Sequence, residues 1–308
     1  MCGYGQNPKN VKVTVLTVEL CEVGPRDGIQ FESRPFDTEL KIELIQALAA
    51  AGIPRIQATS FVHPKWVPQM ADAESIAERL LGDARSTIYS ALALNVRGVE
   101  RALAAGFTAI DLSIATNETH SRDNANMTVE EGVAQAVQMI ERSNTAGVRP
   151  QLGLQTVFGY GAPGDTSIDF IADLAAAFCE RDIESLSLAD STGMANPVSI
   201  RRAIDRVSAV AGDVPIVLHL HDTRGLGMAN VFAAYISGVR RFDTSVGGLG
   251  GCPFIPGATG NISTEDTVYM LESMGIDTEV DGAAVSAIAR RIEAHVGRQL
   301  PGKMHSLE

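Results

Sequence analysis

The stretch Ile216-Val217-Leu218-His219-Leu220-His221 is a short apolar run that ends in two histidines. A segment with helical periodicity follows at residues 228–238, and another apolar run follows at residues 240–246. Short continuous apolar runs are typical of parallel strands that are buried on both faces. Because a helix lies between the two runs, the stretch predicts one strand–helix–strand unit of an α/β fold.

The same alternation extends outward over the whole chain. Apolar runs at residues 11–21, 53–58, 86–93, 108–114, 150–157, 183–188, 216–221 and 240–246 alternate with helical segments at residues 39–51, 71–81, 96–105, 128–146, 167–181, 197–210, 228–238 and 264–274. Eight such units predict a (β/α)8 TIM barrel, with an additional C-terminal helix at residues 282–299. A doubly wound sheet is the alternative, but no G-x-G-x-x-G motif follows the first run, which weakens a dinucleotide-binding interpretation.

These segments also suggest how the chain is divided. We expect a flexible N-terminus at residues 1–10, a catalytic barrel at residues 11–280, and a C-terminal helix and tail at residues 281–308. Thr128 followed by Glu131 has the pattern of a capping box, which marks the start of the longest helix of the barrel.

Composition limits the classes of function. The 308 residues are 45% hydrophobic and 20% charged, as is usual for a soluble globular protein. A formal net charge of −12 argues against a nucleic-acid partner, and no apolar stretch approaches the length of a membrane span. The four cysteines show no C-x-x-C spacing, so a reduced, cytoplasmic protein is the simplest interpretation. The sequence leaves a homodimer open.

A barrel would bring scattered polar residues to one mouth, because catalytic groups lie on the loops after the strands. His219 and His221 point to the same face of a strand, and neutral imidazole is the commonest protein metal ligand. Together with Asp27, which follows the first strand, they predict a mixed nitrogen and oxygen site for Mg²⁺, Mn²⁺ or a related cation. Other strand-end candidates are Arg26, Gln57, Gln155, Asp190 and the glycine-rich residues 247–261.

Each candidate also has an ordinary structural interpretation. Two histidines in an H-x-H pattern are more often plain polar residues than ligands, and Asp27 alone would be a loop carboxylate that caps backbone amides. Arg26 alone would form a surface ion pair, and Cys252 would be a small buried residue. The convergence of several candidates at one predicted mouth favours a site.

Four segments resemble the 3-hydroxy-3-methylglutaryl-CoA lyase family, within the group of metal-dependent barrel lyases and Claisen-type synthases. They are Glu22-Val23-Gly24-Pro25-Arg26-Asp27-Gly28-Ile29-Gln30, Ser60-Phe61-Val62-His63-Pro64-Lys65-Trp66-Val67-Pro68-Gln69-Met70, His219-Leu220-His221-Asp222-Thr223, and Gly247-Gly248-Leu249-Gly250-Gly251-Cys252-Pro253-Phe254 continuing to Gly257-Ala258-Thr259-Gly260-Asn261. The resemblance runs in the same order from about residue 23 to residue 275.

The resemblance implies a reaction and a set of roles. The substrate would be an acyl-CoA thioester, cleaved by retro-aldol chemistry to acetyl-CoA and a keto acid. Mg²⁺ or Mn²⁺ would be held by Asp27, His219, His221 and Asn261. Arg26 would stabilise the negative charge that develops on the thioester oxygen, and Cys252 would protonate the enolate carbon. We place Asp190 with the catalytic residues, and Gln30, Gln57 and Gln155 with those that contact the substrate.

The sequence departs from the family pattern at two places on the predicted mouth. Gln57 stands where the family carries a glutamate, and Gln155-Thr156-Val157-Phe158-Gly159-Tyr160-Gly161 stands where the family usually has Gly-Cys-Pro. A lyase for a differently substituted 3-hydroxy-acyl-CoA is therefore an alternative. A Claisen-type synthase and a non-catalytic barrel that binds an acyl-CoA are further alternatives. The polar residues 117–124 are interpreted as a loop, either solvated or in contact with the substrate.

Overall fold

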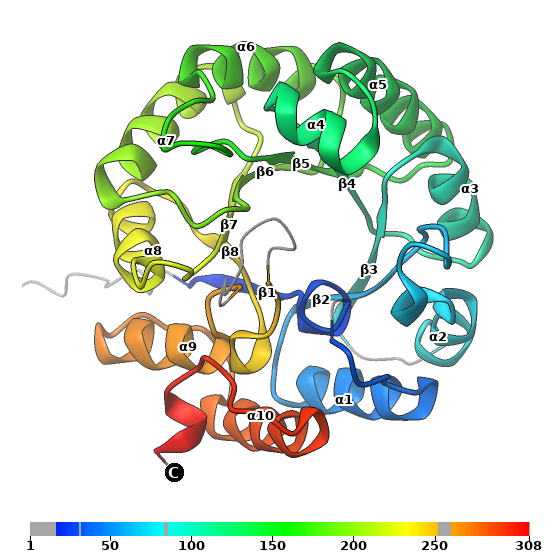
Figure 1. Ribbon diagram of the computed structural model, residues 1–308, viewed down its shortest axis with the longest axis vertical. Coiled ribbons are helices and arrows are strands. Elements are labelled where there is room, and N and C mark those ends of the chain that lie inside the picture. Colours follow the sequence, from blue (N-terminus) through cyan, green and yellow to red (C-terminus); the bar gives the residue numbers. More distant parts are fainter. Residues whose placement is uncertain (1–16, 31, 83–85, 252–259, 308) are drawn as a thin grey trace, which may run out of the picture.

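The computed structural model describes residues 17–30, 32–82, 86–251 and 260–307. Its centre is a closed barrel of parallel strands, in which each strand pairs with the next along the chain and β8 pairs with β1 (Figure 1). The strands are β1 (Glu19–Glu22), β2 (Arg55–Ser60), β3 (Ile88–Ala93), β4 (Ile110–Ala115), β5 (Gln151–Gln155), β6 (Ser185–Asp190), β7 (Ile216–Leu220) and β8 (Arg241–Thr244). The predicted TIM barrel is confirmed.

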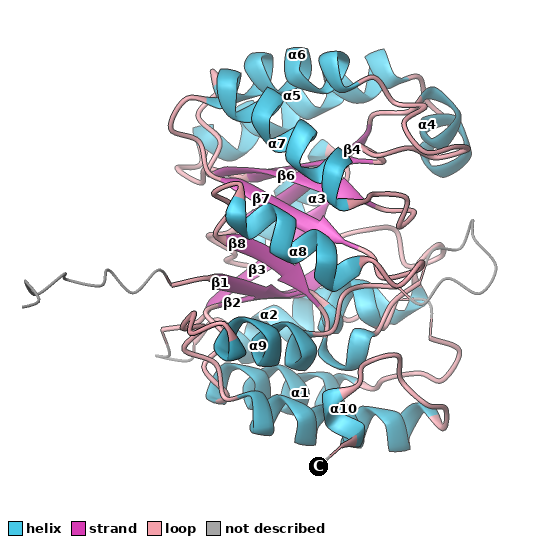
Figure 2. Cartoon of the chain, turned by 90° about the vertical axis from the view of Figure 1, so that its left-hand side faces the viewer, coloured by secondary structure: helices cyan, strands magenta, loops and turns pink. Residues whose placement is uncertain are grey.

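Helices surround the barrel on its outside (Figures 1 and 2). They are α1 (Thr38–Ala50), α2 (Ala73–Leu80), α3 (Val96–Ala104), α4 (Glu118–Ala125), α5 (Val129–Thr145), α6 (Ile168–Cys179), α7 (Pro197–Ala211), α8 (Gly227–Ile236), α9 (Thr264–Ser273) and α10 (Gly282–Val296). The additional C-terminal helix is α10, which packs against α1 and α9. Short helical turns lie at Gly24–Gly28, Pro68–Met70, Val246–Gly248 and Met304–Ser306.

Side-chain caps fix where the helices begin. The capping box predicted for α5 is present, because Thr128 accepts a hydrogen bond from the backbone N–H of Glu131 at 3.0 Å. Glu131 in turn accepts one from the backbone N–H of Thr128 at 2.7 Å. Asn196 caps α7 in the same reciprocal way, immediately before Pro197 in the first turn.

Two segments differ from the predictions. The first described strand is β1 at Glu19–Glu22, whereas an apolar strand was predicted over residues 11–21, of which residues 11–16 lie outside the described part of the chain. Residues 117–124 contain α4 and not a loop. Asn117 starts this helix by accepting hydrogen bonds from the N–H groups of Thr119 and His120. The helix carries almost no apolar side chains, so it lacks the periodicity by which helices are recognised.

The interior of the barrel is unusually polar. Outward-facing strand residues such as Ile56, Leu154 and Leu186 belong to the hydrophobic core. Gln57 and Ser187, next to Ile56 and Leu186 in sequence, line a cavity inside the barrel. Because bulky branched side chains usually fill a TIM barrel, small polar ones leave room for a ligand.

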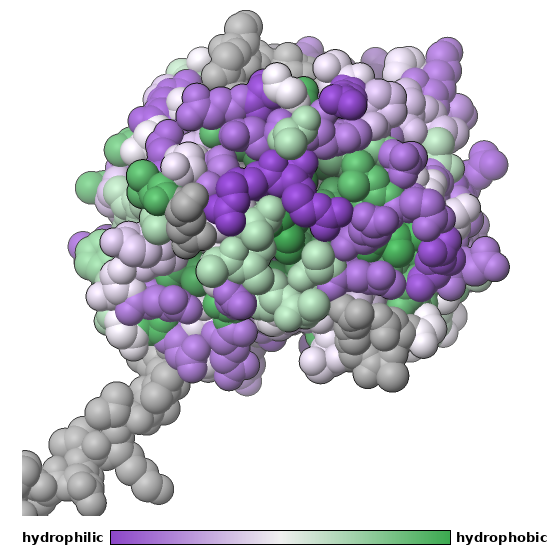
Figure 3. All heavy atoms as spheres, turned by 90° about the horizontal axis from the view of Figure 1, so that it is seen from below, coloured by the Kyte–Doolittle hydropathy of each residue, from purple (hydrophilic) through white to green (hydrophobic). Residues whose placement is uncertain are grey.

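The outer surface carries mixed polarity. On the face that Figure 3 shows, hydrophilic residues lie between smaller hydrophobic areas, as is usual for a folded protein. Among the described residues, no helix is both long and apolar enough to cross a membrane.

Candidate active site

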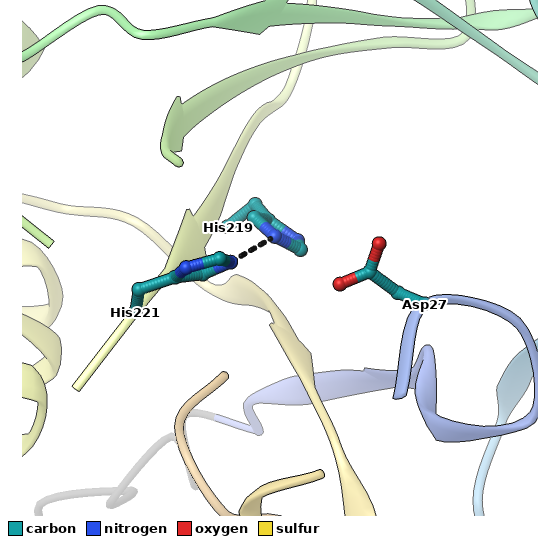
Figure 4. Close-up of side chains that lie close together, drawn as sticks. All are labelled: Asp27, His219 and His221. Atoms are coloured by element: carbon teal, nitrogen blue, oxygen red, sulfur yellow. Dashed lines mark hydrogen bonds between the residues drawn. The ribbon is translucent and has the colours of Figure 1, made fainter. Parts of the chain in front are cut away.

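Asp27, His219 and His221 come together at the mouth of the barrel. Asp27 lies on the helical turn that follows β1, His219 lies on β7, and His221 follows that strand. Their ligating atoms all lie within 4.8 Å of one another, and the two Nε2 atoms are 3.2 Å apart. Figure 4 shows the carboxylate pointing toward the two imidazole rings. We call these three residues the metal cluster.

The turn that carries Asp27 is shaped by local hydrogen bonds. The carbonyl oxygen of Val23 accepts from the backbone N–H groups of Arg26 at 3.1 Å and of Asp27 at 2.7 Å. Gly28 follows, where a Cβ atom would lie only 2.9 Å from both Leu249 Cβ and Ser245 Oγ. Only glycine therefore allows this turn to approach the segment after β8, which brings Asp27 close to Asn261.

Charge and burial set the protonation of the metal cluster. Burial acts to raise the pKa of Asp27, but Arg26 and the two histidines outweigh it and lower that pKa to about 2. Burial, reinforced by His219, lowers the pKa of His221 to about 3. Burial also acts to lower the pKa of His219, but its hydrogen bond to Asp243, at 3.2 Å, raises it overall. At neutral pH the cluster thus offers a carboxylate and a neutral imidazole.

The donor atoms of the metal cluster fit a divalent cation. Asn261 lies beside the cluster, where its Nδ2 donates to Asp27 Oδ2 at 2.8 Å and to the carbonyl oxygen of Leu249 at 3.0 Å. Its Oδ1 atom is buried without a hydrogen-bond partner. A buried amide oxygen next to a carboxylate and two imidazoles completes a set of nitrogen and oxygen ligands.

Arg26 connects the metal cluster to the barrel interior. Its NH1 donates to Asp27 Oδ1 at 2.5 Å, and its Nε donates to Gln57 Oε1. Gln57 Nε2 in turn donates to Asp111 Oδ2 at 2.6 Å. Asp111 is buried and pairs with Arg55 at 2.8 Å. The amide of Gln57 therefore has a fixed orientation, with its oxygen toward Arg26 and its nitrogen toward Asp111.

The remaining predicted site residues have different positions. Gln30 and Gln155 line the cavity, and Gln30 Nε2 donates to Asp27 Oδ1 at 3.2 Å. Asp190 is buried outside the cavity lining, where its carboxylate accepts from the backbone N–H groups of Met194 and Ala195 at 2.8 and 3.1 Å. Burial raises the pKa of Asp190 to about 6. Cys252 lies outside the described residues.

Several cavity residues were missed by the sequence interpretation. Asp243 lines the cavity and orients His219, and no sequence pattern indicated this role. His120 and Asn124, by contrast, belong to the polar residues 117–124 that were considered for substrate contact, and they reach the cavity from α4. Burial lowers the pKa of His120 to about 4, so its imidazole is neutral at pH 7. Further lining residues without charge are Ser113, Gln151, Ser187 and Ser191. For the strand residues, the alternation of side chains separates the two faces of each strand, but it does not show which face turns inward.

Comparisons with known proteins agree with this geometry. The HMGL-like family profile matches residues 17–292. Hydroxymethylglutaryl-CoA lyase of Bacillus subtilis is 40% identical over 286 residues, which cover 93% of this chain and 95% of the relative. (R)-citramalyl-CoA lyase of Chloroflexus aurantiacus is 37% identical over 297 residues, which cover 92% of each chain.

A solved structure gives the same result. An HMG-CoA lyase from Acenitobacter baumannii, in complex with coenzyme A and 3-methylmalate, superimposes with a TM-score of 0.88 and 37% identity. The superposition covers 95% of this chain and 95% of that chain. By the match over most of its length, by its fold and by the arrangement of its strand-end residues, the chain belongs to the HMGL-like family.

Proposed function

We propose that the protein is a carbon–carbon lyase, dependent on a divalent metal, that cleaves a 3-hydroxy-3-methylglutaryl-CoA-like thioester by retro-aldol chemistry. The products are acetyl-CoA and a keto acid. The observation that carries the proposal is the metal cluster with Arg26 beside it, at the mouth of the barrel. The family to which the chain belongs, and its lyase relatives, support the same reaction.

Four side chains would hold Mg²⁺ or Mn²⁺, namely Asp27, His219, His221 and Asn261. When bound there, the cation would supply a positive charge that lowers the pKa of a substrate hydroxyl, which retro-aldol cleavage requires. Asp243 fixes the ring of His219 through Nδ1 and so leaves Nε2 directed at the cluster. Gln30 and Asn261 orient the carboxylate of Asp27 by hydrogen bonds.

Arg26 is placed to stabilise charge that appears only during the reaction. When the C2–C3 bond breaks, its electrons move toward the thioester carbonyl and leave an enolate. Hydrogen bonds to Asp27 and Gln57 hold the guanidinium in one orientation at the cavity wall. Arg26 thereby supplies a fixed positive charge for the thioester oxygen.

Two proton-transfer roles remain as proposed from the sequence. Cys252 would deliver a proton to C2 of the enolate, and the proposal is supported by Gly251, which precedes it and lines the cavity. Asp190 would act on the reaction through the loop after β6, whose backbone amides it binds. Its catalytic role stays a prediction.

One observation favours a second candidate for the acyl group of the substrate. Gln57 donates a hydrogen bond to Asp111, whereas the glutamate that the family carries at this position would repel that carboxylate. The surroundings of the acyl group therefore differ from the family pattern. A relative named (R)-citramalyl-CoA lyase indicates that related barrels act on other 3-hydroxy-acyl-CoA compounds. We therefore propose a differently substituted 3-hydroxy-acyl-CoA as the alternative substrate.

The partner and the location are part of the proposal. A CoA thioester as the substrate is supported by the related lyase structure that holds coenzyme A. We also propose a cytoplasmic location, which is supported by cysteines without C-x-x-C spacing.

The decisive experiment measures acetyl-CoA release. Purified protein is incubated with Mg²⁺ or Mn²⁺ and a panel of 3-hydroxy-acyl-CoA thioesters that includes the methylglutaryl compound. We expect metal-dependent release of acetyl-CoA together with one equivalent of a keto acid. Condensation in the reverse direction as the only activity would instead indicate a synthase, and tight binding without turnover would indicate a non-catalytic barrel.

A further inference from the structure

The cavity has a second polar side, away from the metal cluster. Asp27 and the histidines come from the segments at β1 and β7, whereas β4 and β5 lie across the barrel from β1 and β8 (Figure 1). Strand β6 is next to β7, but Ser187 pairs with Val217 and so lies two residues below the level of His219. Strands β4, β5 and β6 turn uncharged polar side chains into the same cavity, which are Ser113, Gln151, Gln155 and Ser187. We call this set the polar wall.

The polar wall reaches below the mouth of the barrel. Gln151 is the first residue of β5, and Ser187 lies in the middle of β6, so the wall extends toward the amino ends of the strands. Gly153 lies between Gln151 and Gln155 on the same face of β5 and also lines the cavity. Glycine contributes no side chain there, which leaves space beside Ser113.

The polar wall has hydrogen-bonding groups that the protein itself does not use. Within the described part of the chain, no hydrogen bond involves the side chains of Ser113, Ser187 or Gln155. Gln151 accepts through Oε1 from Ser185 at 2.9 Å, and its Nε2 makes no hydrogen bond to a described residue. Polar groups that line a cavity without a protein partner favour a ligand that can form hydrogen bonds with them.

Charge determines which kind of ligand group fits the polar wall. Asp111 and Asp243 also line the cavity, and among the described lining residues the only arginine or lysine is Arg26, which already pairs with Asp27. Arg55 neutralises Asp111 from below but adds no positive charge to the wall. A carboxylate of the substrate is therefore better placed toward the metal cluster and Arg26, and an uncharged group toward the polar wall.

From these observations we infer that the polar wall binds the C3 substituent of the substrate, and that this substituent is longer than methyl and carries an uncharged hydrogen-bonding group such as a hydroxyl. The inference rests on the proposed function, because it assigns the substrate's C3 carbon to the metal side of the cavity. It changes no step of the reaction. The C2–C3 bond still breaks, C2 gains the proton and the C3 hydroxyl becomes the ketone, now with the polar substituent attached.

Binding of uncleavable analogues tests the inference separately from turnover. In these CoA thioethers a CH₂ group replaces the thioester carbonyl, so the electrons of the C2–C3 bond have no acceptor. Three analogues differ only at C3, where they carry methyl, n-propyl or 2-hydroxyethyl. The last two have nearly the same size and differ in one hydroxyl. Their dissociation constants are measured by calorimetry with Mg²⁺-loaded protein.

We expect the 2-hydroxyethyl analogue to bind about tenfold more tightly than the propyl analogue, the effect of one well-formed hydrogen bond. Ser187→Ala and Ser113→Ala together should bring that ratio toward one. Ser208→Ala, an exposed serine on α7, is the matched control and should leave the ratio unchanged. Gly153→Val should weaken both longer analogues relative to the methyl analogue, because it fills the space beside Ser113.

Two results would overturn the inference: equal or tighter binding of the propyl analogue, or a ratio that both serine substitutions leave intact. Acetyl-CoA release from 3-hydroxy-3-methylglutaryl-CoA is measured on the same preparations. If no acetyl-CoA is released but the 2-hydroxyethyl analogue still binds more tightly, the proposed lyase activity is contradicted and the inference on the polar wall is supported. If acetyl-CoA is released but the two longer analogues bind equally, the lyase activity is supported and the inference on the polar wall is contradicted.

Discussion

The metal cluster and the polar wall face the same cavity but are held in opposite ways. Hydrogen bonds from Arg26, Gln30 and Asn261 fix the Asp27 carboxylate, and Asp243 fixes one imidazole. On the polar wall, hydroxyl and amide groups remain available. A constellation that does chemistry must be preorganised, whereas a surface that selects a substrate keeps its hydrogen-bonding capacity for that substrate. The two sides therefore separate reaction type from substrate choice.

Replacing a ligand of the metal cluster should cause the largest loss of activity. His221→Ala should lower acetyl-CoA release by about a thousandfold or more, because it removes one of the four proposed ligands and leaves a single imidazole for the cation. His63→Ala replaces an exposed histidine and is the matched control. Metal content after dialysis, read by elemental analysis, should fall with activity. Full turnover in chelator-treated wild-type protein would contradict the assignment.

The next effect concerns Arg26. Arg26→Met should reduce kcat by roughly a hundredfold while KM changes little, since the interaction with the thioester oxygen strengthens mainly in the transition state. Arg79→Met removes an exposed arginine that pairs with Glu39 and serves as the control. A rise in KM at constant kcat would instead assign Arg26 to uniform binding of the substrate.

Gln57 links Arg26, beside the metal cluster, to Asp111 on β4, and this acidic neighbour determines what a substitution would do. Gln57→Glu would place a second carboxylate about where Nε2 now meets Asp111 at 2.6 Å. We expect a loss of about 2 kcal/mol in the free energy of unfolding, because two buried carboxylates cannot both be ionised at that separation. Asp111→Asn in the same chain should restore most of the loss, since an amide can donate to Glu at position 57.

The same pair of substitutions tests specificity. With Asp111→Asn present to restore folding, Gln57→Glu should shift the ratio of kcat/KM toward the methylglutaryl substrate over a differently substituted one. Chemical denaturation of the wild type, both single variants and the double variant gives the coupling energy. Additive changes in the free energy of unfolding would show that Gln57 and Asp111 do not act as a unit. An unchanged ratio of the two kcat/KM values would show that Gln57 does not contribute to substrate specificity.

The metal side was open to prediction from sequence, but the polar wall was not. His219 and His221 share a strand face by their spacing alone, and the barrel brings the residues after β1 and those after β7 to the same mouth. Ser113, Gln151 and Ser187 are ordinary residues inside apolar strands, and only the closed barrel shows which face turns inward. The pairing of Gln57 with Asp111 likewise joins two strands that are not adjacent, so no local pattern indicates it.

Helix α4 was missed for a related reason. Its residues Glu118–Ala125 lack an apolar stripe, and its start depends on the cap by Asn117. Helical periodicity reports packing against a core, whereas this helix places only part of one face over the barrel and supplies polar groups to the cavity. A polar segment between a strand and a long helix therefore looked like a loop.

The smallest expected effect concerns Glu22, which fixes the turn that carries Asp27. Glu22 lies five residues before Asp27 but is fully buried, and it accepts hydrogen bonds from the N–H groups of Gly24 and Val246 at 2.7 and 2.9 Å and from the Thr264 hydroxyl at 2.6 Å. It thereby ties the turn that bears Asp27 to the segment after β8. Burial raises the pKa of Glu22 from 4.5 to about 7.

The sign of the pH dependence follows from that shift. A carboxyl group whose pKa is higher in the folded than in the unfolded protein adds stability below pH 4.5, and this stability is lost as the pH rises through about 7. Glu22→Gln keeps the shape and can accept from both N–H groups while its amide donates to Thr264 Oγ1, but it cannot ionise. The variant should therefore gain stability relative to the wild type between pH 5 and 8, on the order of 1–3 kcal/mol. Thermal unfolding of both proteins across that range measures the gain. A difference in melting temperature that stays constant with pH would mean that Glu22 is ionised throughout and that its three hydrogen bonds outweigh its burial.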